Sequence, residues 1–435
     1  MSFMEIAVLA AFCLMLLVCV ACSFSILYAL AGGLILFLLY GKSKGFTWAE
    51  LLKLSLSGVK MVKNILIAFI LIGMLTALWR DAGTIPVIVC YAAQIINPQL
   101  FVLMAFLLNC LVSVLTGTAF GTAATMGVIC MTISSGMQID PLLTGGAVLS
   151  GVFFGDRCSP VSTSALLVAN LTQTSIFQNI KQMVRTAFIP FILACAVYAG
   201  AGFVSSAGGE VPDLRAIFGR EFDLSLFTLL PAVVIFALAA MQIDVKRAMG
   251  ASIITAVPVS IFVQQTPLAD LPQLMFWGYT AADAGIARML NGGGIVSMLN
   301  VSAIVCLSSS YAGLFEKTGL LNSAEKGISL LAAKTTNFAA VLCTAVITAM
   351  IACNQVLAVM LTHQLCGKIV NCENRMAIYL EDTAVVVAAL VPWSIASTVP
   401  LASVGAPLAS IAFACFLYIL PLWRLLVERS AAADA

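Results

Sequence analysis

Charged residues are scarce in this chain of 435 residues. Asp, Glu, Lys and Arg make up 9% of it, and hydrophobic residues make up 62%. Disordered chains need the opposite balance, and soluble domains carry about 25% charged residues. Because 21 Lys and Arg are offset by 19 Asp and Glu, the chain has no basic surface for nucleic acid. The composition therefore excludes a disordered chain and a nucleic-acid partner.

Histidine is also nearly absent. His363 is the single histidine, which excludes a zinc site of the H-E-x-x-H type and a histidine-rich metal cage. The 14 cysteines lie mostly in apolar runs, where a free thiol behaves as a small hydrophobe. An enzyme in the membrane would need a metal, or a nucleophile with its base. We therefore expect no enzyme, no catalytic residue and no bound cofactor.

Uncharged apolar sequence is what the chain has in abundance. A membrane-spanning helix takes about 20 residues, so the chain can form roughly 10–13 helical segments. Residues 6–40 carry no charge, and we expect two helices there, at 5–21 and 23–40. The predicted fold class is an all-α polytopic membrane protein surrounded by membrane lipid.

The charges of the loops predict the orientation. Residues 41–63 carry five lysines and one acid, Glu50, and loops rich in lysine stay in the cytoplasm. Residues 205–223 are acidic and lie between expected spans near 186–204 and 224–241. The N-terminus is then cytoplasmic, and residues 206–223 form an extracytoplasmic linker. We expect the protein in the cytoplasmic (inner) membrane of a prokaryote.

Weak internal matches suggest a repeat. Residues 77–83 and 313–319 each place a charged pair after an aromatic residue. At the same offset residues 116–118 fall on 352–354, and at a slightly shorter offset Asp156 falls on Asp382. We predict a first repeat at 1–205 and a second at 224–430, the ground plan of many secondary transporters. Chance matching in an apolar chain is the alternative.

One apolar segment of the first half is interrupted by glycine and threonine. Residues 116–127 read TGTAFGTAATMG and follow a regular apolar run. Irregular backbone at membrane depth is tolerated only inside the protein or beside a cavity. A re-entrant helical hairpin would fit, with Thr116, Thr118 and Thr122 beside free backbone groups. Packing of small residues between helices is the alternative.

A second interruption carries a charge pair. In residues 155–165, GDRCSPVSTSA, Pro160 ends one helix and the hydroxyl residues Ser159, Ser162, Thr163 and Ser164 precede or open the next. An aspartate at mid-membrane costs about 2.5–3.5 kcal/mol, so Asp156 is a candidate functional residue. A water-exposed loop with an ordinary Asp156–Arg157 pair is the alternative.

The second half offers polar counterparts. Asn354 and Gln355 lie inside the uncharged stretch 335–367, and Glu381, Asp382 and Thr383 open a run that breaks at residues 392–393. In the first half the pair Arg80–Asp81 precedes Gly and Pro. That pair suits a gate or an anion site, and the alternative for arginine is snorkelling to the interface.

With these segments the chain resembles the NhaC-type sodium/proton antiporter family of the ion-transporter superfamily. The segments are GTIP (83–86), TGTAFGTAATMG (116–127), SGVFFGDRCSPVS (150–162), GGGIVSMLN (292–300) and LEDTAVVVAALVPW (380–393). The resemblance implies inverted repeats, broken helices, two re-entrant hairpins, a scaffold with a mobile transport domain, and a homodimer.

The chain departs from the family pattern at two acids. Thr163 stands where the family has Asp, and Cys353-Asn354-Gln355 stands where it has Gly-Asp-Gln. Two functions therefore stay open, both by alternating access with Na⁺ and/or H⁺ as coupling ion. One is Na⁺/H⁺ antiport, with Asp156 and Asp382 binding either cation. The other is a Na⁺- or H⁺-coupled carrier of a small organic carboxylate or amino acid.

The candidate substrate- or ion-binding residues are Thr116, Thr118, Thr122, Asp156, Ser159, Ser162, Thr163, Ser164, Asn354, Gln355, Asp382 and Thr383. The candidates for gating or anion pairing are Arg80, Asp81, Arg157 and Glu381. The expected Na⁺ ligands among them are Asp156 and Asp382.

Overall fold

The computed structural model describes residues 3–22, 24–95, 97–160, 162–205, 214–241, 243–283, 286–287, 290–318 and 325–433. These residues are almost entirely helical, and the β pairing within them is an isolated bridge between Tyr279 and Gly292. Residues 206–213 of the expected linker lie outside the described part of the chain.

The elements of the first half are α1 (Phe3–Ala21), α2 (Ile26–Ser43), α3 (Trp48–Met61), α4 (Lys63–Asp81), α5 (Thr84–Ile95), η1 (Pro98–Leu100), α6 (Phe101–Thr116), α7 (Ala119–Thr122), η2 (Ala123–Gly127), α8 (Val128–Gly136), α9 (Pro141–Cys158), α10 (Thr163–Leu171) and α11 (Ile176–Ser205).

The elements of the second half are α12 (Leu214–Phe218), η3 (Leu226–Leu229), α13 (Leu230–Ala240), α14 (Val245–Phe262), α15 (Leu271–Trp277), η4 (Ile295–Met298), α17 (Leu299–Thr318), α18 (Glu325–Lys334), α19 (Asn337–Ala352), α20 (Gln355–Cys366), α21 (Glu373–Asp382), α22 (Ala384–Val387), η6 (Ala388–Leu390), α23 (Ile395–Val404), η7 (Leu408–Phe413) and α24 (Cys415–Ala433).

Many of these helices meet the requirements of a membrane span. Five stretches in the described residues are long and apolar enough, and the number rises to seven if each of two bent pairs counts as one span. Further apolar helices, such as 337–352 and 355–366, are shorter. The prediction of a polytopic all-α membrane protein is confirmed.

The spans differ in how much of their surface the protein covers. Only 28% of the best apolar window within 176–204 is buried, whereas 83% is buried for residues 119–136. Helix α11 is therefore the least covered of the five spans, and the segment α7–η2–α8 lies in the interior.

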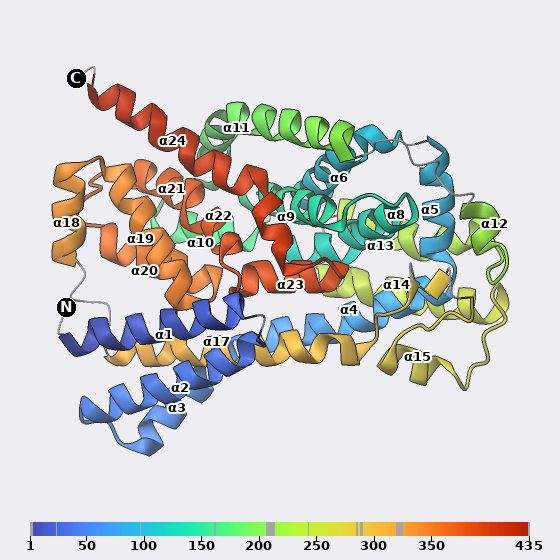
Figure 1. Ribbon diagram of the computed structural model, residues 1–435, viewed down its shortest axis with the longest axis horizontal. Coiled ribbons are helices and arrows are strands. Elements are labelled where there is room, and N and C mark those ends of the chain that lie inside the picture. The colour runs from blue at the N-terminus through green and yellow to red at the C-terminus, as the bar shows by residue number, and fades with distance from the viewer. Residues whose placement is uncertain are drawn as a thin grey trace.

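The long helices run roughly along the long axis of the molecule (Figure 1). Helices α1 to α4 and α17 form the lower layer in this view, and α6, α9, α11, α19 to α22 and α24 form the upper one, with α23 between them. Helix α17 packs against α2 and α3, and α9 packs against α6 and α24. Residues of both halves of the chain thus contribute to each layer.

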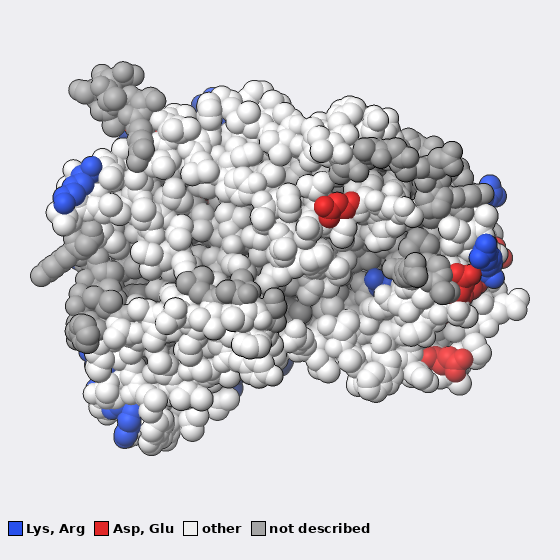
Figure 2. All heavy atoms as spheres, viewed as in Figure 1, with Lys and Arg blue, Asp and Glu red and all other residues white. Residues whose placement is uncertain are grey.

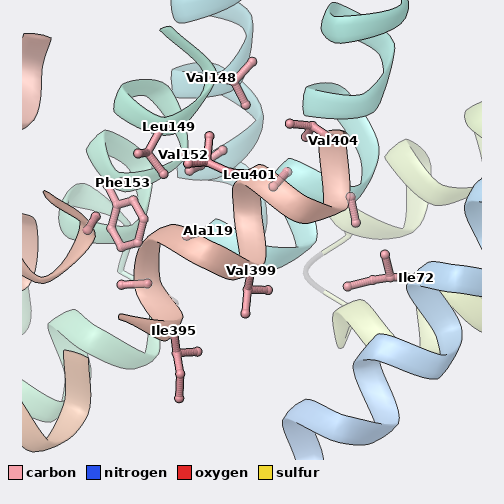
Figure 3. Close-up of a cluster of buried hydrophobic side chains, with 14 of the residues drawn as sticks. Ile72, Ala119, Val148, Leu149, Val152, Phe153, Ile395, Val399, Leu401 and Val404 are labelled. Atoms are coloured by element: carbon pink, nitrogen blue, oxygen red, sulfur yellow. The ribbon is translucent and has the colours of Figure 1, made fainter. Parts of the chain in front are cut away.

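Packing between these helices is dense. The rings of Phe12, Phe37 and Tyr311 meet edge to face at 5.0–5.5 Å between centroids, joining α1, α2 and α17. Figure 3 shows Val148 and Val152 of α9 beside Leu401 and Val404 of α23. This apolar contact leaves α9 little freedom, and α9 is the helix that carries Asp156.

Most charges on the visible face lie towards the two ends of the molecule. Figure 2 shows basic side chains at the left-hand end, both basic and acidic ones at the right-hand end, and between them a largely uncharged band with isolated charged groups. The left-hand end holds α18 and the turn between α2 and α3, and the right-hand end holds α12 and α15 (Figure 1). An uncharged band between charged ends is the arrangement that a bilayer requires.

Candidate functional site

The helix carrying Asp156 ends in the interior, as Pro160 predicts. Helix α9 stops at Cys158, and α10 begins at Thr163 with Ser162 as its N-cap, whose hydroxyl accepts from the N–H groups of residues 164 and 165. A Cβ on Gly155 would collide with the backbone of α6 at residues 113 and 114. Only glycine permits this close approach, and the contact fixes the position of Asp156 along α6.

Asp156 is held by neutral groups. Its side chain is 4% exposed, Ser162 Oγ donates to Oδ1 at 3.1 Å, and Ser164 Oγ donates to Oδ2 at 2.8 Å. Gln355 Nε2 of α20 lies 3.4 Å from Oδ2, and the backbone N–H of Ala119 at the start of α7 also donates to this carboxyl. Four elements, α7, α9, α10 and α20, therefore converge on one carboxyl group.

Two helix breaks with the same backbone geometry supply these contacts. Gly117 ends α6 with φ 64°, and Thr118 follows in extended conformation as the N-cap of α7. Cys353 ends α19 with φ 55°, and Asn354 follows in extended conformation as the N-cap of α20. The sequence match of 116–118 with 352–354 therefore joins two segments with the same local fold.

The breaks differ in their surroundings. Helices α19 and α20 pack against each other along their length, and both are shorter than a span, as in a re-entrant hairpin. The stretches 98–116 and 119–136 on either side of the first break are each long and apolar enough to span. A π-helical turn, residues 123–127, follows this break, and such turns are frequent at functional sites.

The side chain of Arg157 has other partners than the side chain of Asp156. It is fully buried, forms an ion pair with Asp382, and donates from Nη2 to Thr186 Oγ1 at 2.9 Å. Its Nη1 and Nε donate to the carbonyl oxygens of Met183 and Glu381, at 3.1 Å each. The guanidinium therefore ties α9 to α11 and α21, and it does not neutralise Asp156.

The carboxylate of Asp382 is contacted by several polar groups. Besides Arg157, its carboxylate accepts from Thr186 Oγ1 at 3.1 Å and lies 3.9 Å from Arg424 Nε of α24. Two guanidinium groups beside one carboxylate disfavour a further cation. The carboxylate of Asp382 is therefore less available to a cation than that of Asp156. Thr186 and Arg424 were not among the predicted residues, because single polar residues in long apolar helices reveal no partner.

The remaining predicted residues of the breaks make local contacts. Ser159 donates to the carbonyl oxygen of Val114 at 2.7 Å, and the hydroxyls of Thr116 and Thr122 lie 2.9 Å apart across the first break. Asn354 Oδ1 caps α20, and Thr383 donates to the carbonyl oxygen of Tyr379. Thr163 is exposed at the start of α10. These residues shape the site from outside the hydrogen-bond shell of Asp156.

Arg80 and Asp81 lie at the end of α4, beside a 65° bend between residues 66–81 and 84–91. Arg80 Nη1 donates to the carbonyl oxygen of Thr76 at 2.8 Å, and Asp81 accepts from Thr266 at 3.1 and 3.3 Å. The structure therefore places this pair at the bend of α4, in contact with the segment after α14 instead of with the Asp156 site.

The Asp156 site combines one carboxylate with two hydroxyls and two N–H donors. In the part of the chain that the structure describes, His, Cys, Asp and Glu form no cluster of three that could hold a metal. The carboxylate and hydroxyl oxygens are ligands of the kind that suits hard cations better than transition metals.

A buried carboxyl where broken helices meet inside a polytopic membrane protein defines the class of secondary transporters. Comparison with known sequences specifies the family. The chain matches the sequence model of the Na⁺/H⁺ antiporter family over residues 1–170 and 151–425, and it belongs to this family.

Several curated proteins are similar to the chain. It is 27% identical to the Na⁺/H⁺ antiporter NhaC of Bacillus subtilis over 88% of this chain and 87% of that protein. It is 32% identical to the arginine/ornithine antiporter of Halobacterium salinarum and 26% identical to the malate-2H⁺/Na⁺-lactate antiporter of Bacillus subtilis. The aligned parts span 59% and 62% of these two relatives, and 64% and 65% of this chain.

Proposed function

We propose that the protein exchanges Na⁺ for H⁺ by alternating access, with Asp156 as the carboxylate that binds Na⁺. The observation that carries this proposal is the environment of Asp156, which is buried at a meeting of helix breaks and contacted by hydroxyl and amide groups. A carboxylate so placed keeps its negative charge available to a cation. The similarity to Na⁺/H⁺ antiporters over most of the chain supports the same function.

The arrangement in the membrane is part of this proposal. The halves 1–205 and 224–430 act as repeats joined by the linker 206–223, and the matching geometry of the two helix breaks supports this division. The basic end of the molecule faces the cytoplasm of a prokaryote together with the N-terminus. A scaffold with a mobile transport domain, and a homodimer, follow from the family resemblance alone.

Asp156→Asn tests the proposal. Purified protein is placed in liposomes with a pH-sensitive dye, no organic solute is added, and Na⁺ is raised outside. We expect a Na⁺-dependent pH change for the wild type and none for Asp156→Asn, since the amide cannot supply the negative charge. Asp140→Asn is the matched control, because Asp140 is exposed at the start of α9. Unchanged transport by Asp156→Asn would refute the site.

A Na⁺- or H⁺-coupled carrier of a small organic carboxylate or amino acid is the second candidate. The relatives that exchange arginine for ornithine and malate for lactate favour it. The amides of Asn354 and Gln355 at the start of α20 could then contact the solute. If the wild type gives no pH change with Na⁺ alone but gives one after an amino acid or carboxylate is added, this candidate replaces the first.

A further inference from the structure

Glu381 is a buried acid whose carboxyl group has no hydrogen-bond partner among the described residues. Its side chain is 0% exposed, and among the described residues neither Oε1 nor Oε2 has a hydrogen-bond partner. Its buried neighbours differ, since Asp382 is ion-paired with Arg157 and Asp156 accepts from two serines. A buried carboxylate without hydrogen bonds or a counter-ion is far less stable than the neutral acid.

Among the side chains that the structure describes, the charges around Glu381 include no unpaired buried cation. From α9, Arg157, Asp156 and Cys158 act electrostatically with Glu381, and from its own helix Asp382 does so. The other packed elements contribute little. In α24, Arg424 pairs with Glu428 at 2.8 Å and lies 3.9 Å from Asp382. Lys181 and Arg185 of α11 are exposed, α20 carries His363 and Cys366 in its last turns, and α10, α19 and α22 hold no Asp, Glu, Lys or Arg.

A charge count follows from these contacts. Arg157 and Asp382 neutralise each other, so Asp156 and Glu381 together determine the charge of the interior at this level. When both acids are ionised and one monovalent cation is bound, their total charge equals that of an ionised Asp156 beside a protonated Glu381. One Na⁺ at Asp156 and one proton at Glu381 are therefore electrostatically interchangeable.

The helix break after Glu381 links the two acids mechanically. Gln355 Nε2 contacts Asp156 and also donates to the carbonyl oxygen of Val385 at 3.0 Å. Val385 lies in α22, which begins after the irregular residue Thr383, with φ −126° and ψ −85°. A cation at Asp156 would displace this N–H donor, and the displacement would reach the segment directly after Glu381 through the bond to Val385.

We propose that Glu381 is the proton-binding group of the exchanger and that Asp156 is the cation-binding group. In this conformation the carboxyl of Glu381 holds the proton. The proton leaves to water when the site opens and Na⁺ arrives at Asp156, and it returns when Na⁺ leaves. This assignment rests on the proposed Na⁺/H⁺ exchange and divides its two ions between two residues.

The test measures Na⁺ movement and proton movement separately in liposomes. Radioactive Na⁺ counterflow at equal pH on both sides reports Na⁺ binding and passage, and the internal pH dye reports protons. We expect Glu381→Gln to lose the Na⁺-driven pH change and to keep counterflow at a higher Na⁺ concentration, since the amide mimics the protonated acid permanently. We expect Asp156→Asn to lose both. Glu373→Gln is the matched control, as Glu373 is exposed on the same helix.

The variant Glu381→Asp is the control for a folding defect. It keeps a titratable carboxyl, and we expect it to retain the Na⁺-driven pH change with a displaced pH profile. A pH change of wild-type size in Glu381→Gln would overturn the assignment, and so would loss of counterflow in correctly folded Glu381→Gln. Absence of Na⁺ counterflow in the wild type would instead contradict the proposed function itself.

Discussion

At the scale of single residues, Asp156 and Arg157 are adjacent in sequence but have different neighbours, and they therefore have different roles. Asp156 faces hydroxyl and amide groups, whereas Arg157 faces Asp382 on α21. The sequence alone permits an Asp156–Arg157 pair in a loop, and the structure contradicts that alternative because both side chains are buried at the end of α9. Removing the charge partner of a buried ion is costly, so Arg157 has a structural role.

Part of this site could be predicted from residue types. Asp156, Ser162 and Ser164 lie within a few residues of one another, so a break at Pro160 is enough to bring them together. The ion pair of Arg157 with Asp382 joins positions 225 residues apart, and no local pattern encodes that distance. Even nearby residues are not predicted reliably. Thr163 directly precedes Ser164 in α10, yet its side chain is exposed and makes no hydrogen bond to Asp156.

The contrast between Ser164 and Thr163 gives a prediction. Ser164→Ala removes the hydroxyl 2.8 Å from Asp156 Oδ2, and a hydrogen bond to a charged group contributes about 1.5–3 kcal/mol. We expect the apparent Na⁺ affinity to fall by at least about tenfold. The exposed neighbour provides the control, so Thr163→Ala should leave affinity unchanged. The Na⁺ dependence of transport in liposomes measures both, and the reverse order of effects would contradict the proposed site.

At the scale of elements, the site is made by interrupted helices. The first interruption could be predicted, because Gly117 adopts positive φ without strain and Thr118 after it caps the next helix. The second could be located only by its match to the first, because Cys353 adopts the same left-handed conformation without being glycine. Composition therefore indicates breaks, and the three-dimensional contacts decide which of them meet.

Gly117 provides a test of the first break. Its φ of 64° is unfavourable for a residue with Cβ, and Gly117→Ala should lower stability by about 1–2 kcal/mol. Gly200 lies within α11, where an added Cβ would meet no other atom within 4 Å, so Gly200→Ala should be neutral or slightly stabilising. Thermal unfolding in detergent compares the two, and equal melting temperatures would refute the assigned geometry.

Helix α3 yields a pH dependence outside the membrane spans. The backbone N–H and hydroxyl of Thr47 both donate to Glu50 in a capping box, and these bonds hold the pKa of the Glu50 carboxyl below its usual range. A lowered pKa contributes stability above the unfolded pKa, and that stability is lost as the pH falls through the folded value. Hydrogen exchange of α3 should therefore accelerate in acid beyond its intrinsic change.

Glu50→Gln tests this explanation of the pH dependence. Because the amide does not titrate, the variant should show the same relative exchange rate in residues 48–61 at neutral and acidic pH. Mass spectrometry of peptides from α3 provides the measurement, with peptides from α11 as an internal reference. A wild-type α3 whose corrected exchange rate does not change with pH would contradict the role of Glu50.

At the scale of the whole molecule, the distribution of charge specifies an axis that the helices follow. Basic side chains gather at the end that holds α18 and the turn between α2 and α3, whereas the end with α12 and α15 carries both acidic and basic ones (Figures 1 and 2). Loop charges could predict this polarity because each loop is local in sequence. The mixing of both halves within each layer could not be predicted, since it depends on packing such as that of α17 against α2 and α3.

The proposed orientation can be tested with two thiols at opposite ends of this axis. Cys372 is exposed in the turn between α20 and α21, and Asp223 is exposed after α12. In a background with Cys22 and Cys343 replaced by Ala, a membrane-impermeant maleimide should label Cys372 only in inverted vesicles. After Cys372→Ala, Asp223→Cys should be labelled only in intact cells. Labelling of both from one side would contradict a membrane between them, and the reverse pattern would invert the topology while leaving the Asp156 site as it is.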